Sequence, residues 1–127
     1  MVNVKDVYKR FGDLEVLKGI SLEVKQGEVV SVIGSSGSGK STLLRCINRL
    51  EEVTSGEIYF EDQEITGDKK NVRELRSKIG MVFQNFNLFK HMTIMKNMIY
   101  AQMHVKKVPK EEAIAVSYTH LTLPTIL

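Results

Sequence analysis

One stretch decides the fold of this 127-residue chain: Gly34-Ser35-Ser36-Gly37-Ser38-Gly39-Lys40-Ser41-Thr42. An apolar run at residues 29–33 precedes it, and apolar residues with helical spacing follow it at residues 43–50. Between a strand and a helix, a glycine-rich loop binds phosphate, because free backbone N–H groups and the positive end of the helix dipole meet there. The stretch therefore predicts a phosphate-binding loop. The alternative is a flexible Gly/Ser-rich turn that happens to contain a lysine.

The residue types in this stretch fit a nucleoside triphosphate with its magnesium ion. Its three glycines allow positive φ angles and let the backbone wrap closely around phosphate oxygens, where any Cβ atom would obstruct it. Lys40 supplies a compact cation for the β- and γ-phosphates, and the Ser41 hydroxyl suits Mg²⁺. Thr42 can reach the α-phosphate. We therefore expect all nine residues to line the nucleotide site.

Composition narrows the class of protein. The chain has 18 basic and 15 acidic residues, and its lysines are scattered, so we expect no nucleic-acid partner. No apolar stretch is long enough to cross a bilayer, and no secretory signal is evident at the N-terminus, which predicts a cytoplasmic protein. Cys46 is the only cysteine, and its helical position favours a buried packing role.

Outward from the loop, hydrophobic periodicity predicts an α/β chain with helices against a mixed sheet. Two half-buried strands are expected on either side of a turn at Gly12-Asp13. The other expected strands are residues 28–33, 57–60 and 79–83, and the expected helices are residues 40–49, 71–77, 94–103 and 110–116. Residues 28–33 are apolar almost throughout, as is typical of a strand covered on both faces of a parallel sheet.

Two further stretches, residues 15–22 and 80–89, carry a family resemblance. Together with the loop they make residues 1 to about 115 resemble ATP-binding subunits of ABC transporters, most of all the branch that imports polar amino acids. The resemblance implies the core of a P-loop NTPase of the ABC ATPase type, with a mixed β-sheet and the start of the helical subdomain, truncated. It also implies the cofactors ATP and Mg²⁺.

The resemblance assigns roles to single residues. It implies that Phe11 stacks on adenine, that Val16 is an apolar neighbour of the base, and that Gln84 reaches Mg²⁺ and the attacking water. Lys40 and Gln84 would then be the catalytic residues, and Ser41 and Gln84 the metal ligands. From pattern alone, Phe11 could equally be a core aromatic residue and Gln84 a plain strand end.

The resemblance also implies partners. The segment after Gln84 would meet the membrane subunits of a transporter through Phe86, Leu88, Phe89 and His91, and the full-length protein would form a homodimer with a second ATPase subunit. This would place it on the inner face of the cell membrane as a peripheral protein. A row of methionines at residues 92–103 is expected to pack mainly in the core.

Several parts of the family's pattern do not occur in the 127 residues. These are the Leu-Ser-Gly-Gly-Gln signature, the Mg²⁺-orienting aspartate at a strand end and the catalytic glutamate beside it. From Ser117 onward, β-branched residues and Pro124 replace helix formers. We expect residues 1–116 to be the N-terminal part of an ABC-type nucleotide-binding domain, and residues 117–127 to be an unrelated or disordered tail.

The leading hypothesis is an ATP-binding subunit, present as a fragment, that couples ATP binding and hydrolysis to import of polar amino acids. Because the signature, the Mg²⁺-orienting aspartate and the catalytic glutamate are missing, we expect the fragment itself to be inactive. The alternatives are a nucleotide-binding remnant without catalytic function and a P-loop NTPase outside transport.

Overall fold

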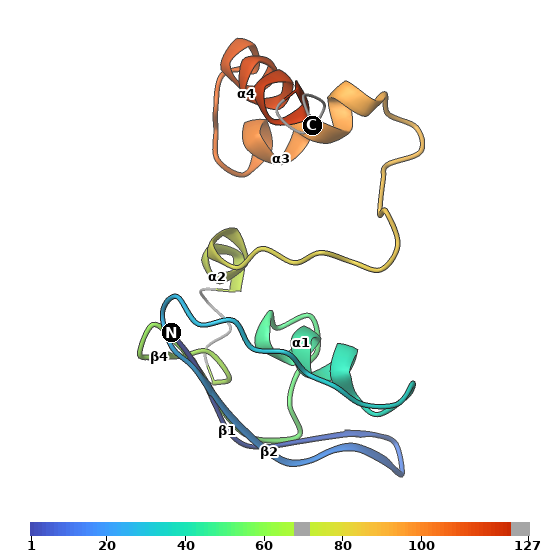
Figure 1. Ribbon diagram of the computed structural model, residues 1–127, viewed down its shortest axis with the longest axis vertical. Coiled ribbons are helices and arrows are strands. Elements are labelled where there is room, and N and C mark those ends of the chain that lie inside the picture. The colour runs from blue at the N-terminus through green and yellow to red at the C-terminus, as the bar shows by residue number, and fades with distance from the viewer. Residues whose placement is uncertain (68–71, 123–127) are drawn as a thin grey trace. The chain divides into compact units, whose positions relative to one another are not determined.

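The computed structural model describes residues 1–67 and 72–122, coloured from blue to red in Figure 1. The chain forms two compact units, and the boundary between them falls between Met81 and Val82. Within the described residues, the first unit holds the sheet and two helices, and the second unit holds two more helices.

An antiparallel sheet is the frame of the first unit. Its strands lie in the order β2-β1-β3-β4. They are β1 (Val2–Phe11), β2 (Leu14–Val24), β3 (Ser55–Phe60) and β4 (Gln63–Glu64). Phe11 faces Leu14 across the Gly12-Asp13 turn, which confirms the expected pair of strands at the start of the chain. The expected strand at residues 57–60 is confirmed as β3.

Helix α1 (Lys40–Ile47) packs against this sheet, and helix α2 (Val72–Lys78) follows the β3–β4 hairpin. Both helices were predicted within two residues of their observed ends. The core contains Leu43 and Cys46 of α1 together with apolar side chains of the strands and of α2. The remaining buried members are Val4, Val7, Leu17, Ile58, Ile65 and Leu75. This burial fixes the start of α1 on the sheet and with it the end of the phosphate-binding loop.

Two of the predicted strands do not form. Residues 28–33 and 79–83 have no strand structure, and Val29 and Ile33 are each 93% exposed while Val82 is 99% exposed. Every strand pairing in residues 1–67 and 72–122 is antiparallel. A parallel strand is stabilised by pairing with a strand that is distant in sequence, and no strand in the described residues pairs with these segments. The prediction that both are buried strands was therefore wrong.

Helices α3 (Ile94–His104) and α4 (Lys110–Thr122) make up the second unit. The predicted cap is confirmed, because Thr93 Oγ1 accepts a hydrogen bond from the Lys96 amide at 3.3 Å. Ile99 of α3 is buried, whereas Ile94, predicted on the same apolar face, is exposed. Gln102 Nε2 donates to Ser117 Oγ at 3.1 Å and joins the two helices.

Helix α4 runs six residues beyond the predicted end at Val116. Ser117 is 2% exposed, and its hydroxyl donates to the Ala113 carbonyl at 2.8 Å. Thr119 donates to Ala115 in the same way at 3.0 Å. These bonds and the contact with α3 override the weak helix propensity of the segment. The prediction of disorder was therefore wrong for residues 117–122. Residues 123–127 lie outside the described residues. The unrelated origin of the tail stays a prediction.

The burial of Cys46 predicts a pH dependence of stability. Burial raises the pKa of the Cys46 thiol, opposed by the nearby Lys9 charge and reinforced by Glu51. A group whose pKa is higher in the folded than in the unfolded state loses its stabilising contribution as the pH rises through the folded pKa. The free energy of unfolding should therefore fall between about pH 8 and pH 10, around the usual thiol range.

Urea unfolding at both pH values, followed by circular dichroism, measures this fall. A Cys46→Ala variant is the control, because it should lose less stability over the same interval than the parent chain. Equal losses in the two proteins would contradict the contribution of the thiol.

Candidate functional site

The phosphate-binding loop predicted at residues 34–42 leads into α1, as expected from the sequence. Gly37 and Gly39 have φ angles of 81° and 93°, so these two glycines use the positive φ that their residue type allows. Gly34 does not adopt a positive φ angle. The reason for a glycine there is space, because a Cβ atom would lie 2.7 Å from Ser38 Oγ.

The helix start is free to receive an anion. Gly39 is the N-cap residue and makes no side-chain cap bond, and the first turn of α1 contains no acidic residue. The first backbone bond of the helix runs from the Leu43 amide to the Gly39 carbonyl at 2.8 Å. The amides of Lys40, Ser41 and Thr42 therefore have no partner within the helix, which is the arrangement that binds phosphate at a helix N-terminus.

Lys40 turns back along the loop. Its Nζ donates to the carbonyl oxygens of Gly34 at 2.8 Å and Ser35 at 2.6 Å, and to Ser38 Oγ at 3.2 Å. These three bonds hold the ammonium group within the loop and connect the first part of the loop to the helix. Lys40 therefore fixes the loop conformation as well as supplying the positive charge expected from the sequence.

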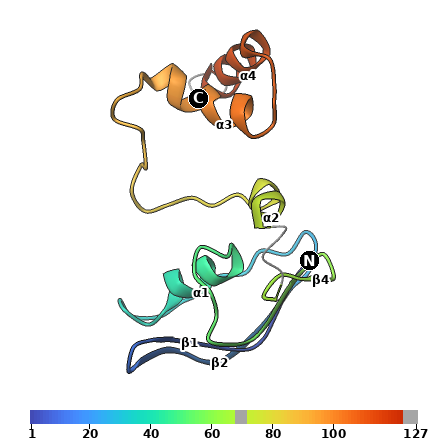
Figure 2. The same ribbon diagram turned by 180° about the vertical axis from the view of Figure 1, so that it is seen from behind.

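The loop end packs on the edge strand β2. A Cβ atom on Gly39 would lie 3.0 Å from Leu17 Cδ2 and 3.1 Å from both Val16 Cγ1 and the Val16 carbonyl oxygen. Both views place the loop and the β1–β2 turn on the same side of the first unit (Figures 1 and 2). The structure thus brings Val16 next to Gly39 of the phosphate-binding loop, although these two residues are 23 positions apart in sequence.

Phe11 ends β1 on the same hairpin, and the residue is 45% exposed. The Lys9 ammonium lies over the Phe11 ring, 4.6 Å from the ring centroid. The ring is therefore accessible, as a base-stacking residue must be. Its contact with adenine stays a prediction.

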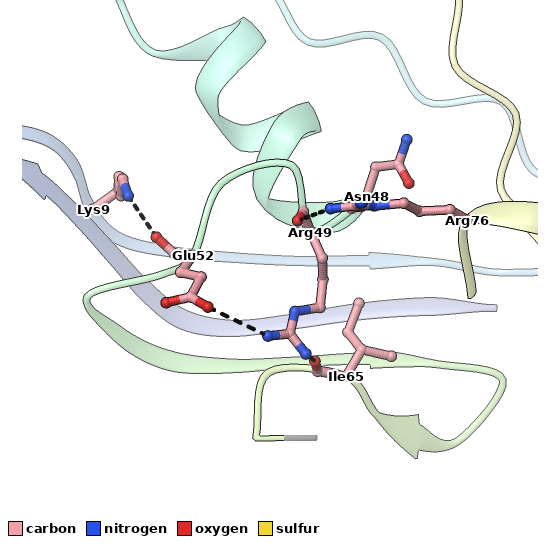
Figure 3. A network of polar contacts seen from close by, with 6 residues as sticks. All are labelled: Lys9, Asn48, Arg49, Glu52, Ile65 and Arg76. Carbon is pink, nitrogen blue, oxygen red and sulfur yellow. Dashed lines mark hydrogen bonds and ion pairs between the residues drawn. The ribbon is translucent and has the colours of Figure 1, made fainter. Parts of the chain in front are cut away.

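A polar network fixes the segment that follows α1 (Figure 3). Lys9 Nζ donates to the Glu52 carbonyl at 2.6 Å, and Arg49 Nη1 donates to the Ile65 carbonyl at 2.6 Å. Arg76 of α2 donates to the Arg49 carbonyl, also at 2.6 Å. Sequence reasoning missed Lys9 and Arg49, because these contacts join residues far apart in the chain and follow no periodic pattern.

Gln84 belongs to the second unit, where it lies exposed in a bend. Its contact with Mg²⁺ and water stays a prediction, as does the Ser41 contact with Mg²⁺. Phe86, Leu88 and Phe89 are exposed, as a partner surface requires. In residues 1–67 and 72–122, no three His, Cys, Asp or Glu side chains lie close enough together to hold a metal ion.

Asn97 holds the end of that exposed segment. Its side chain accepts a hydrogen bond from the Phe89 amide at 2.7 Å and donates to the carbonyls of Phe89, Met92 and Thr93. The Phe89 ring also lies 5.3 Å from the Tyr100 ring, centroid to centroid. The residues just before α3 are therefore fixed to the helix, while Phe86 remains free of these contacts.

Comparison with known proteins settles the family. A family model described as ABC transporter matches residues 17–125. The chain belongs to the ABC transporter family. The glutamine transport ATP-binding protein GlnQ of Geobacillus stearothermophilus is 50% identical over 113 residues, which cover 89% of this chain and 47% of that protein. The arginine transport ATP-binding protein ArtM of Bacillus subtilis is 52% identical, with the same coverage of both chains.

The chain thus spans about half the length of these ABC transporter relatives. Among solved structures, it is similar to a dimeric ATP-binding cassette in a post-hydrolysis state bound to ADP and phosphate. The TM-score is 0.87 at 35% identity, covering 96% of this chain and 56% of the other. The predicted fold class, an ABC ATPase core, is confirmed. None of the helices in residues 1–67 and 72–122 is long and apolar enough to span a membrane.

Proposed function

We propose that this chain is the nucleotide-binding part of an ATPase subunit that powers the import of polar amino acids. The observation that carries the proposal is the loop at residues 34–42, with its positive-φ glycines, its unpaired helix amides and the Lys40 ammonium held within it. The names of the relatives, transport ATP-binding proteins for glutamine and arginine, support the choice of amino acids as the transported solute.

In this proposal the phosphates of ATP are bound by the amides of residues 37–40, by the unpaired amides of Ser41 and Thr42 at the helix start, and by the Lys40 ammonium, which replace their water shell with fixed donors. Thr42 contacts the α-phosphate. Phe11 and Val16 contact the base from the neighbouring hairpin. Mg²⁺, bound by Ser41 and Gln84, would neutralise charge on the phosphates.

We further propose that the complete subunit is a cytoplasmic protein on the inner face of the cell membrane. There, the exposed residues after Gln84 would contact the membrane subunits of the transporter, and a second ATPase subunit would complete each nucleotide site. Charge developing in the transition state would then be stabilised from both sides of the nucleotide. The dimeric state of the similar ATP-binding cassette supports this assembly.

The 127-residue chain itself is proposed to bind nucleotide without turning it over at enzymatic rates. The signature sequence and the acidic catalytic residues of the family do not occur in it. Lys40 and the loop amides would contact ATP from one side only. Binding and turnover should therefore be separable in this chain.

Isothermal titration of the purified chain with MgATP tests the proposal, together with a phosphate-release assay on the same sample. We expect saturable binding at one site and turnover well below about 1 per second, a modest rate for an enzyme. A folded chain that does not bind MgATP would overturn the nucleotide-binding function. Stronger binding of MgGTP than of MgATP would favour a P-loop NTPase of another kind.

A further inference from the structure

The Lys9 ammonium is held in a fixed position beside the proposed base site. It donates to the Glu52 carbonyl at 2.6 Å and forms an ion pair with the Glu51 carboxylate at 3.2 Å. The Lys9 side chain is only 12% exposed. Two oxygens from the segment after α1 therefore fix the cation that lies 4.6 Å from the Phe11 ring centroid.

We propose that Lys9 is a positioning residue for the nucleotide base and acts through Phe11. Its ammonium covers one face of the Phe11 ring, which leaves the opposite face for a purine. This inference rests on the proposed function, because it assigns a residue to the same nucleotide site. It concerns the base alone and does not involve the phosphate-binding loop.

Two physical effects support the role. First, Phe11 is the last residue of β1, next to the exposed turn of the β1–β2 hairpin. A side chain there has rotational freedom that it would lose on stacking against a base. Contact with a fixed cation restricts that freedom before the nucleotide arrives. Second, a cation over one face draws π-electron density toward itself, and the opposite face then stacks better on an electron-rich purine.

The same strand offers a matched control. Lys5 lies over the Tyr59 ring at 4.7 Å, a pair with nearly the same geometry. Lys5 is exposed and follows the buried Val4, so it lies on the opposite face of the sheet from the core. Lys5→Met therefore removes one lysine–aromatic pair and one charge from β1 without touching the proposed site.

The experiment compares binding of MgATP with binding of magnesium tripolyphosphate, which has the phosphates and no base. Lys9→Met keeps the aliphatic stem and should weaken MgATP binding about 3- to 30-fold, the range of a partly buried cation–π contact. Tripolyphosphate affinity should be unchanged. Lys9→Arg should restore most of the MgATP affinity, and Lys5→Met should change neither affinity.

A double-mutant cycle with Phe11→Ala completes the test. Without the ring, Lys9→Met should cause no additional loss of MgATP affinity. Unchanged MgATP affinity in Lys9→Met would overturn the inference, and so would an equal loss for MgATP and tripolyphosphate, which indicates a general structural effect. If the parent chain binds neither MgATP nor tripolyphosphate, the proposed function itself fails. That result differs from the two outcomes that would overturn only the inference about Lys9.

Discussion

Lys40→Met should reduce the affinity for MgATP by about 100-fold or more, since several charge-assisted hydrogen bonds are lost together. The ammonium group now donates to two loop carbonyls and to Ser38 Oγ, so its removal takes away the cation that meets the phosphates and the bonds that shape the loop. Methionine keeps a similar apolar stem. Isothermal titration with MgATP and with magnesium tripolyphosphate should show losses of similar size, because both ligands present the same phosphates.

Lys18→Met is the control for this experiment. Lys18 is exposed on β2, two residues from Val16, and its substitution changes the net charge by the same amount. We expect its MgATP affinity to match that of the parent chain. Parent-like affinity in Lys40→Met, or an equal loss in both variants, would refute the role of the loop lysine.

Gly56→Ala should destabilise the first unit by about 3 kcal/mol or more, combining a left-handed backbone with overpacking. Gly56 has a φ angle of 93°, and a Cβ atom there would lie 2.3 Å from the Asp6 carbonyl oxygen and 2.7 Å from Val7 Cα. These are backbone atoms of β1, next to an irregularity in its pairing with β3 between Lys5 and Tyr8. The central strand pair would have to shift to make room for the methyl group.

Gly27→Ala separates crowding from backbone strain. Its φ angle is 78°, and no atom lies within 4 Å of the Cβ position, so only the left-handed strain of about 1–2 kcal/mol applies. Labelling of the Cys46 thiol at increasing urea concentrations reports on the first unit alone, because this buried residue is the only cysteine. Similar urea midpoints for the two variants would show that the contact with β1 has no effect.

The sequence was informative where structure depends on near neighbours in the chain. The phosphate-binding loop, the Thr93 cap and the β1–β2 turn all rest on a few adjacent residues, and each lies where it was predicted. The family was also recognisable, because the loop and residues 80–89 are characteristic in their residue types. Features of this kind depend on a few adjacent residues, so they can be predicted without knowledge of the rest of the fold.

Predictions that depend on distant parts of the chain were less successful. Residues 28–33 have the composition of a buried strand, but composition cannot tell whether a neighbouring strand is present. The end of α4 was missed because the bond between Ser117 and Gln102 joins two helices. Lys9 was missed for a similar reason, since its partners Glu51 and Glu52 become neighbours only after α1 has packed on the sheet.

The uncovered apolar residues at 28–33 and 81–83 have a thermodynamic consequence. Both the urea dependence of the unfolding free energy and the heat-capacity increment scale with the surface that unfolding newly hydrates. Val29, Ile33 and Val82 are already hydrated in the folded chain, so unfolding adds little to their contact with water. This protein should therefore show a shallower urea dependence and a flatter stability curve than a closed domain of the same length.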